Sequence, residues 1–221
     1  MKILVIDVGG THVKLLATGK RTPRKLPSGQ DLTPHDMVKA VLSATTDWTY
    51  DRLSIGYPGP VSNDRPTMEP ANLGKGWVKF DYASAFKHPV KMVNDAAMQA
   101  FGSYDGGRML FLGLGTGLGS ALVRDGMVVP LELAHLPYRK GRTYEDYVGA
   151  AGMKRLGHDK WQRHVFAVVD QLRVAMTSDY VVLGGGNARL LGELPANARL
   201  GSNLNAFRGG YRLWQKAARL T

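Results

Sequence analysis

The segment that decides the fold lies at the start of the chain: Ile3-Leu4-Val5-Ile6-Asp7-Val8-Gly9-Gly10-Thr11-His12-Val13-Lys14-Leu15-Leu16-Ala17. Its opening apolar run is typical of a strand that is buried on both faces. The glycines after Asp7 indicate a tight turn, and His12–Ala17 reads as a returning strand. We therefore expect a β-hairpin to open the fold, with a carboxylate and a glycine turn where its first strand ends.

The same arrangement returns in the second half of the chain. Met109–Leu112 is apolar, Gly113–Gly119 is glycine-rich, and Ala121–Val123 is apolar again. A third apolar strand, Val181–Leu183, runs into Gly184-Gly185-Gly186. Such turns allow consecutive backbone N–H groups to point at a phosphate, although glycine also serves simply to supply positive φ. Three clusters at three strand ends favour the phosphate interpretation.

Helical spacing of apolar residues occurs between these strands. We expect further short strands at Leu53–Ile55 and Val90–Val93, and helices over these ranges: Pro34 onward with Thr33 as N-cap, Asn94-Asp95 to about Phe101, Thr143–Leu156, Lys160–Met176 and Ala206–Arg219. Alternating strands and helices indicate an α/β protein with two lobes. The expected division is a first lobe over 1–105, a second over 106–205, and a helix within 206–221 that packs back on the first lobe.

The charge balance is the unusual feature of the composition. The 221 residues include 29 Lys and Arg against 18 Asp and Glu, a formal net charge of +11. A basic surface favours nucleic acid, anionic membrane or phosphorylated small molecules as partners. The chain has no cysteine, which excludes disulfides, Cys-based zinc sites and thiol nucleophiles. No apolar stretch reaches the length of a signal-peptide core or a membrane span, so we expect a cytoplasmic protein.

Neither the Gly-Lys-Ser/Thr sequence of a Walker-type loop nor the glycine spacing of the dinucleotide fingerprint occurs in the chain. Instead, Asp7 through Lys14 resembles the first phosphate loop of the sugar-kinase/actin/Hsp70 superfamily, and within it the ROK-type glucokinases. The resemblance continues, in order, through Gly56-Tyr57-Pro58-Gly59-Pro60-Val61, Asn72-Leu73-Gly74-Lys75-Gly76-Trp77, Asn94-Asp95-Ala96, Gly115-Thr116-Gly117, Glu132-Leu133-Ala134-His135 and Gly184-Gly185-Gly186. The Asn72–Trp77 segment and the short length look most like the polyphosphate glucokinase branch. This resemblance implies a two-lobed actin-like, ribonuclease H-like fold with a cleft between the lobes.

Asp95 is the candidate catalytic base. It follows a buried strand at a helix start, where it serves either as a helix N-cap or as a carboxylate held in an active site. The resemblance implies the second role, in which Asp95 takes the proton of the 6-hydroxyl of glucose while phosphate arrives from polyphosphate, ATP or both. The resemblance implies a sugar-binding set of Asn72, Asn94, Asp95, Glu132, His135 and Glu145. Glu145 equally suits the first turn of a helix, where its charge is favoured.

The phosphate-binding set that the resemblance implies consists of Asp7, Gly9, Gly10, Thr11, Lys14, Gly115, Thr116 and Gly117. Asp7 would hold Mg²⁺ through a bound water, and its alternative role is to cap the turn. Lys14 matches the basic residue that follows the first loop in the family, and it is equally well interpreted as a solvated strand residue. Gly184, Gly185, Gly186 and Asn187 match the region that borders adenosine in nucleotide-using relatives. Family members often carry a Cys-rich zinc loop between the sugar-binding His and Glu. Only nine residues separate His135 from Glu145, so no zinc site is expected.

Other interpretations stay open at this point. One is an ATP-only kinase of this family for another hexose or an N-acetylhexosamine, because Ala134 stands where Gly is common. Another is a non-catalytic polyanion-binding or sugar-sensing protein. For the kinase we expect glucose and polyphosphate or ATP as partners, no nucleic acid and no membrane, and a homodimer by family analogy alone. The cations in two exposed segments would form a track for polyphosphate: Lys20, Arg21, Arg24, Lys25, Arg139, Lys140 and Arg142.

Overall fold

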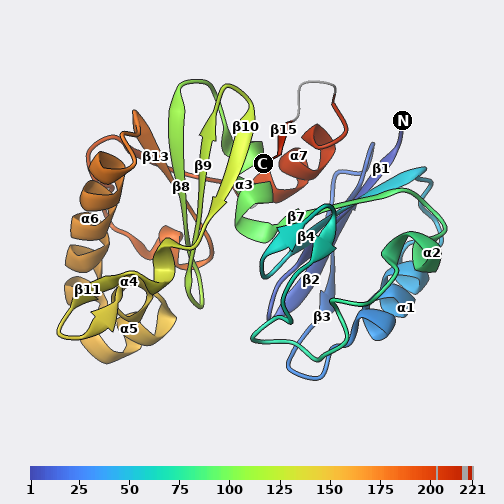
Figure 1. The fold of residues 1–221 in the computed structure, drawn as a ribbon, viewed down its shortest axis with the longest axis horizontal. Helices are drawn as coiled ribbons and strands as arrows, with labels where there is room; N and C mark the ends of the chain where they lie inside the picture. Colours follow the sequence, from blue (N-terminus) through green and yellow to red (C-terminus); the bar gives the residue numbers. More distant parts are fainter. Residues whose placement is uncertain (203, 216–218, 221) are drawn as a thin grey trace. The chain divides into compact units, whose positions relative to one another are not determined.

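A computed structural model describes residues 1–202, 204–215 and 219–220, and the chain divides into two compact units (Figure 1). The first unit contains Met1–Met98 and the segment that begins at Ala206. The second contains Gln99–Asn205 and the last strand, β15 (Arg219–Leu220). The division lies inside helix α3 (Asp95–Ser103), whereas the sequence suggested a boundary after residue 105. Because α3 continues across this boundary, the amino-acid composition does not change there, and the sequence alone does not mark it.

The first unit is built on a five-stranded sheet with the order β3-β2-β1-β4-β7. Its strands are β1 (Ile3–Val8), β2 (His12–Ala17), β3 (Arg24–Pro27), β4 (Arg52–Tyr57) and β7 (Val90–Asn94). β1, β4 and β7 are parallel, while β2 and β3 are antiparallel to their neighbours. Asp7 is in register with Gly56, and Tyr57 with Asn94. The carboxyl ends of the three parallel strands therefore meet along one edge of the sheet.

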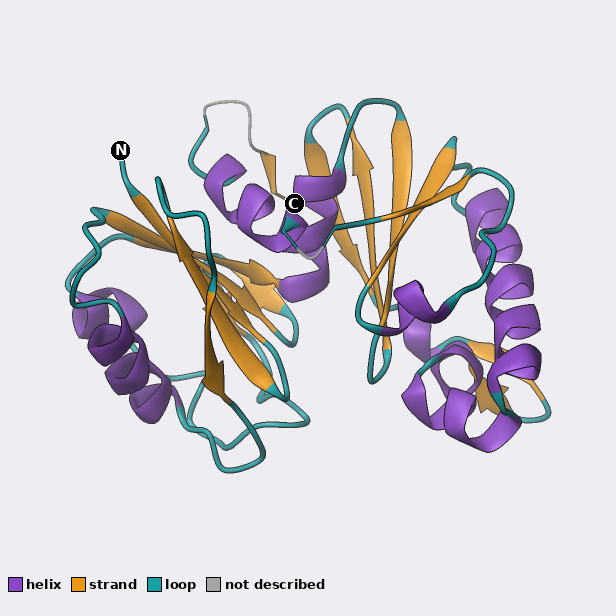
Figure 2. Cartoon of the chain, turned by 180° about the vertical axis from the view of Figure 1, so that it is seen from behind, coloured by secondary structure: helices purple, strands orange, loops and turns teal. Residues whose placement is uncertain are grey.

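The two faces of this sheet are covered by different helices. Leu4, Ile6 and Val8 alternate along β1 and pack in one core with α1 (Pro34–Ala44) and α2 (Tyr82–Phe86). Figure 2 shows the longer of these helices lying along the sheet. Thr33 caps α1 as expected, because its side chain accepts a hydrogen bond from Asp36 N. A two-strand ribbon of β5 (Val61–Ser62) and β6 (Arg65–Pro66) completes the unit's strands.

Helix α7 (Asn205–Arg212) packs on the opposite face. Gly210 lies so close to Val5 that a Cβ at this position would collide with the valine side chain. Ser54 Oγ donates to Gly210 O at 2.6 Å and accepts from Trp214 Nε1 at 3.0 Å. The cationic groups of Arg52 and Lys91 lie 4.9 and 5.0 Å from the centre of the Trp214 ring. Trp214 thus fastens the end of this segment to β4 and β7.

The second unit repeats the strand order of the first. Its sheet runs β14-β13-β8-β9-β10-β15, and β8, β9 and β10 form an antiparallel meander beside parallel β13 and β14. The bounds are β8 (Arg108–Leu114), β9 (Leu118–Arg124), β10 (Met127–Leu131), β13 (Tyr180–Gly184) and β14 (Ala198–Leu200). Gly113 is in register with Gly184. The second and third glycine clusters therefore meet at one edge, as the strand ends of the first unit do.

Helix α6 (His158–Ala175) covers one face of this sheet. Its buried stripe includes Trp161, Val165 and Val169, which pack against Leu110 and Leu112 of β8. The expected helix over Thr143–Leu156 is two helices, α4 (Tyr144–Val148) and α5 (Ala150–Leu156). The helix breaks because Gly149 adopts an extended ψ of 174°. The sequence did not predict this break, because the apolar spacing on the two sides of Gly149 gives no sign of a turn.

The remaining elements of the second unit were not expected from the sequence in this form. They are η1 (Leu133–His135), the hairpin β11 (Pro137–Arg139) and β12 (Arg142–Thr143), and η2 (Asn187–Leu190). The expected last helix is shorter than Ala206–Arg219: α7 ends at Arg212, Arg219 lies in β15, and residues 216–218 lie outside the described residues. In the described residues, none of the helices has the length and apolar character needed to cross a membrane.

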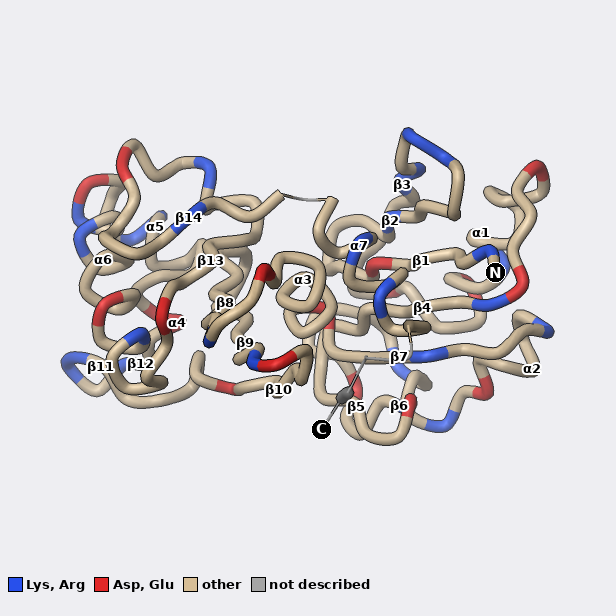
Figure 3. Tube along the Cα trace, turned by 90° about the horizontal axis from the view of Figure 1, so that it is seen from above, with Lys and Arg blue, Asp and Glu red and all other residues tan. Residues whose placement is uncertain are grey.

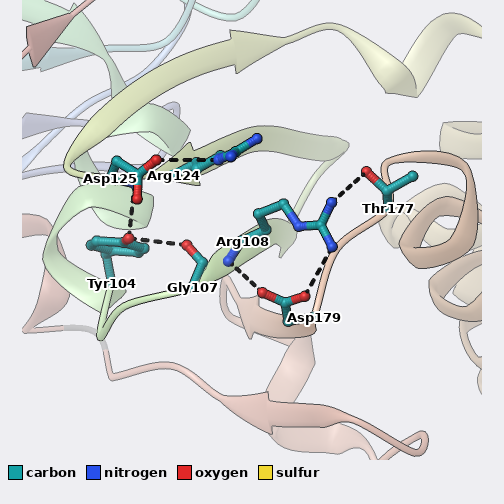
Figure 4. A network of polar contacts seen from close by, with 7 residues as sticks. All are labelled: Tyr104, Gly107, Arg108, Arg124, Asp125, Thr177 and Asp179. Carbon is teal, nitrogen blue, oxygen red and sulfur yellow. Dashed lines mark hydrogen bonds and ion pairs between the residues drawn. The ribbon is translucent and has the colours of Figure 1, made fainter.

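A polar network fixes the end of the second sheet that is remote from its glycine turns (Figure 4). Arg108 N donates to Asp179 Oδ2 at 2.8 Å, and the Arg108 guanidinium meets the other oxygen of that carboxylate at 3.3 Å. The Tyr104 hydroxyl donates to Gly107 O and accepts from Asp125 N. These bonds tie the start of β8 to the segments before β13 and between β9 and β10.

We predict that Trp214→Ala lowers the free energy of unfolding of the first unit by about 2 kcal/mol, since it removes a large packed ring and two cation–π contacts. Trp214→Phe keeps the ring and loses only the Nε1 bond to Ser54, so it should cost about 1 kcal/mol. Thermal and urea unfolding of both variants measure this. Equal stability of Trp214→Ala and the parent chain would contradict a fastening role.

Candidate functional site

Asp7 lies at the carboxyl end of β1, on the face of the sheet opposite α1. Its side chain is nearly buried, with 4% of its surface exposed. Lys14 is its register partner on β2, and Lys14 Nζ donates to Asp7 Oδ2 at 3.1 Å. The pairing follows from the hairpin, because opposed residues in adjacent strands place their side chains on the same face. Lys14 is therefore not a solvated strand residue but the counter-charge of a buried carboxylate.

The helix cap beside Asp95 is provided by Asn94. Asn94 Oδ1 accepts from Ala97 N at 3.1 Å, which is the usual bond of an N-cap side chain, and Asn94 Nδ2 donates to Gly59 O at 3.2 Å. Asp95 Oδ1 accepts from the adjacent Ala96 N, at 2.8 Å. The capping role that the sequence allowed for Asp95 thus belongs to its neighbour, and Asp95 keeps a carboxylate oxygen for other partners.

The environment of Asp95 disfavours its charge. Burial, with the negative charge of Asp7 as the second cause, raises the pKa of Asp95 to about 7, although the bond from Ala96 N and the charge of Lys14 oppose this rise in part. Gly56 allows the start of α3 to pack closely against β4, because a Cβ at position 56 would lie 3.5 Å from Asp95 Cα and would collide with the Met98 side chain. Two carboxylates thus share one ammonium group, and the second carboxylate is set to bind and release a proton near neutral pH.

The first glycine turn lies next to this group. Gly9 N donates to His12 O within the turn, and Ser28 Oγ, at the end of β3, donates to Gly9 O at 2.7 Å. Gly10 is adjacent to Asn72, since a Cβ at Gly10 would lie 3.4 Å from Asn72 Cβ. Gly10 and Thr11 are exposed, so this part of the turn is accessible to a ligand.

A carboxylate that the sequence analysis did not select holds the loop of Asn72. Glu69 accepts hydrogen bonds from three consecutive backbone amides, Gly76 N at 3.0 Å, Trp77 N at 3.1 Å and Val78 N at 3.4 Å. Gly76 has a φ of 98°, which an L-residue rarely adopts and which turns these amides inward. Glu69 therefore closes the loop from residue 70 to 78. In the sequence, only Gly74 and Gly76 indicate a loop in which consecutive amides point at one anion.

In the second unit, the Gly115–Gly117 turn closes the hairpin of β8 and β9. Glu145 Oε2 accepts from Leu118 N at 3.1 Å, and a side chain at Gly117 would collide with this carboxylate. Asn187 Nδ2 donates to Gly115 O at 2.9 Å. The second and third glycine clusters and Glu145 therefore form one compact group, and a carboxylate already occupies one amide of the turn.

Glu132 and His135 flank the short helix η1. Ser120 of β9, itself 2% exposed, accepts from Leu133 N at 3.2 Å and donates to Leu131 O at 2.8 Å, which fixes where η1 begins. His135 Nε2 lies 3.9 Å from Glu132 Oε2, and both side chains are mostly exposed. Tyr144 N donates to Leu136 O, so this pair lies in the same region of the unit as α4, which carries Glu145.

The expected site residues thus form two groups, one in each unit. The first unit brings together Asp7, Gly9, Gly10, Thr11, Lys14, Asn72, Asn94 and Asp95. The second brings together Gly115, Thr116, Gly117, Glu132, His135, Glu145, Gly184, Gly185, Gly186 and Asn187. Sequence reasoning missed the residues that support these groups, among them Ser28, Glu69 and Ser120. Their roles depend on which loop lies against which strand, and no local pattern marks that.

Comparisons with known proteins found relatives among sugar kinases. The chain is 27% identical over 206 residues to a polyphosphate glucokinase of Mycobacterium tuberculosis, covering 83% of this chain and 77% of the relative. A polyphosphate/ATP-glucomannokinase from Arthrobacter sp. strain KM superposes with a TM-score of 0.81 at 22% identity, covering 94% of this chain and 96% of that one. A ROK family glucokinase from Streptomyces griseus gives a TM-score of 0.76 at 16% identity, covering 95% and 97%. The chain has the fold of the ROK sugar kinases.

The resemblance to ROK-type glucokinases seen in the sequence is therefore confirmed, and so is the α/β, two-lobed actin-like fold class that it implied. No family model matches the chain. The segment between His135 and Glu145 is occupied by the β11–β12 hairpin. The described residues contain no group of three or more His, Cys, Asp or Glu side chains that could hold a metal ion.

We predict that Asp95→Asn stabilises the protein at high pH. Because the folded-state pKa of about 7 lies above the ordinary value of 3.8, the folded state holds a proton that the unfolded state has lost between these pH values. Stability contributed by this group falls as pH rises through that window. The variant should match the parent near pH 4 and exceed it above pH 7 by at most about 4 kcal/mol.

Urea unfolding of both proteins from pH 4 to pH 9 measures this difference. Asp81→Asn is the matched control, because hydrogen bonds from Ser84 lower the pKa of Asp81. The ionised Asp81 carboxylate stabilises the folded state above its ordinary pKa and loses this effect on acidification. Asp81→Asn should therefore lower stability at high pH and have less effect at low pH, which is the opposite trend to Asp95→Asn. A pH-independent effect of Asp95→Asn would contradict a raised pKa.

Proposed function

We propose that this protein is a glucokinase that transfers a phosphoryl group from polyphosphate, ATP or both to the 6-hydroxyl of glucose. The observation that carries the proposal is the carboxylate of Asp95, which does not cap its helix and has a pKa of about 7. General bases work best when their pKa lies near the working pH. The similarity to polyphosphate glucokinases supports the choice of sugar and donor.

In the proposed reaction, the Asp95 carboxylate accepts the proton of the 6-hydroxyl as that oxygen attacks the terminal phosphorus of the donor. The bond between this phosphorus and its bridging oxygen breaks, and the leaving group is polyphosphate one unit shorter, or ADP. Asn72, Asn94, Glu132, His135 and Glu145 are proposed to bind the sugar hydroxyls. A carboxylate and an imidazole three residues apart suit a sugar, because neighbouring hydroxyls both donate and accept.

The donor phosphates are proposed to bind the two exposed glycine turns, Gly9-Gly10-Thr11 and Gly115-Thr116-Gly117, with the Gly184–Asn187 cluster bordering the rest of the donor. Lys14 is proposed to face both carboxylates and the incoming phosphate. Its pairing with Asp7 at 3.1 Å keeps an ammonium group at the point where negative charge accumulates.

Mg²⁺ is the metal proposed for this reaction. Asp7 fits a role through bound water, because one of its oxygens is already engaged by Lys14 and the described residues offer no complete set of protein ligands. Mg²⁺ usually keeps several waters and binds through substrate phosphates, so it would arrive with the donor and neutralise its charge.

Asp95→Asn tests the proposal directly. The variant should lose roughly 100- to 10,000-fold in kcat with either donor, while the dissociation constant of glucose changes less than about threefold. For the parent enzyme, kcat/KM for glucose should fall about tenfold per pH unit below pH 7, because the protonated carboxyl cannot accept a proton. Glucose 6-phosphate formation with ATP and with long-chain polyphosphate, assayed in parallel, supplies the measurements.

Mannose and N-acetylmannosamine belong in the same assay as competing acceptors. Turnover of an N-acetylhexosamine in preference to glucose would replace the proposed sugar and leave the kinase intact. The absence of product with every sugar and both donors would contradict the kinase itself and favour a binding protein.

Glu69→Ala tests the support of the Asn72 loop. Loss of the three amide bonds should loosen the loop and raise KM for glucose about tenfold, with kcat and KM for the donor changed less than about twofold. Glu69→Gln keeps one side-chain oxygen as acceptor and should recover part of the loss. Glu193→Ala, at an exposed carboxylate elsewhere, is the control. Equal losses in kcat and KM would contradict a positioning role.

A further inference from the structure

The second unit carries a group of cations that the proposed chemistry does not use. Arg139 and Arg142 pair across the β11–β12 hairpin, and Lys140 occupies its tip with a left-handed φ of 50°. All three side chains are exposed. Arg155 of α5 and Arg163 of α6 are exposed as well. Figure 3 shows Lys and Arg positions concentrated at this hairpin. We call these five residues the hairpin surface.

Four of the five cations act on the same two neighbours, His164 and Asp146, and Lys140 lies between two of them at the hairpin tip. His164 of α6 shares a hydrogen bond of 3.1 Å with the Tyr138 hydroxyl at the base of the hairpin. Burial lowers the pKa of His164, and the charges of Arg139, Arg163 and Arg155 lower it further. Three guanidinium groups from three different elements therefore face one imidazole. Arg142 and Arg155 in turn face Asp146, whose pKa they help to lower.

Carboxylates do not neutralise this surface. None of its five cations forms an ion pair within 4.0 Å with another described residue. Asp146, the acid they face, is held in the capping box with Thr143. Arg155 donates to the Asp146 backbone oxygen and lies 5.4 Å from the centre of the Tyr147 ring, so its guanidinium is oriented without a direct ion pair. The ring of Tyr138 packs against those of Tyr144 and Tyr147.

The other basic segment of the chain differs in this respect. The Arg24 guanidinium makes two hydrogen bonds to Asp47, at 2.6 and 2.7 Å, and lies 4.2 Å from the centre of the Trp48 ring. Lys20 also acts on the carboxylate of Asp47. Arg24, one of the four cations that the sequence suggested for a polyphosphate track in this segment, is thus committed to an ion pair. The hairpin surface is the better candidate for an external anion.

We propose that the hairpin surface binds the part of a polyphosphate chain that lies beyond its reacting end. The inference rests on the proposed function, since it concerns one of the two proposed donors. The planar guanidinium binds phosphate oxygens in a bidentate manner, and arginines spaced over three elements suit a linear polyanion with a charge on every unit. The hairpin also joins His135 to Glu145 in the sequence, so the chain would be held by the segment that carries proposed sugar ligands.

The test uses the variant Arg139→Ser/Lys140→Asn/Arg142→Ser, in which asparagine tolerates the left-handed backbone at position 140. A matched control, Lys39→Ser/Lys79→Ser/Arg208→Ser, removes the same charge from exposed positions of the first unit. For long-chain polyphosphate, kcat/KM of the hairpin variant should fall at least about tenfold, and the slope of log kcat/KM against log salt should decrease by about 2. ATP and tripolyphosphate kinetics should change less than about twofold.

Equilibrium binding of labelled long-chain polyphosphate, with single-stranded DNA of equal charge as competitor, separates this inference from the proposed function. Weaker binding of polyphosphate by the hairpin variant alone supports the surface even if no kinase activity is found. Equal losses for ATP and long chains, unchanged binding by the hairpin variant, or an equal loss in the control would overturn it. DNA that binds as tightly as polyphosphate would assign the surface to nucleic acid instead.

Discussion

Two carboxylates that share one ammonium group are the constraint on which the first unit depends. Three parallel strands end at the same edge, and Asp7 of β1 is in register with Gly56 of β4, which pairs on its other side with β7, the strand that leads to Asp95. Lys14, opposite Asp7 on the hairpin, compensates one full charge and only part of the second. Burial first, and this uncompensated negative charge second, raise the pKa of Asp95 to about 7. The Gly56 backbone, the Asn94 cap and the Asp7 pair therefore act together on a single proton.

The second unit has the same strand order and also places a charged side chain beside a glycine turn. Its glycine turn also closes a hairpin at a sheet edge, but the charge beside it is the carboxylate of Glu145, bound to Leu118 N. A carboxylate at an amide of the turn resists a phosphate at that position, because two anions would compete for one donor.

The sequence predicted what depends on local pattern. The opening hairpin, the cap at Thr33 and the long helix α6 follow from apolar spacing and turn residues, and the structure confirms them. The break at Gly149 and the early end of α7 were missed, because helical spacing continues through both. Asp95 and Asn94 are equally good caps by residue type, and only the bond to Ala97 N decides between them. Glu69 binds amides seven to nine residues away, which no local rule anticipates.

The hairpin between His135 and Glu145 is supported by stacked side chains. Tyr138 stacks on Tyr144 with ring centres 5.1 Å apart and meets Tyr147 and His164 edge-on. Such a support contains no thiol to oxidise and no ion to lose to a chelator. Burial of aromatic surface also weakens on cooling rather than on mild warming. The segment that carries the proposed sugar ligands should therefore keep its shape in oxidising or metal-poor surroundings and lose it first in the cold.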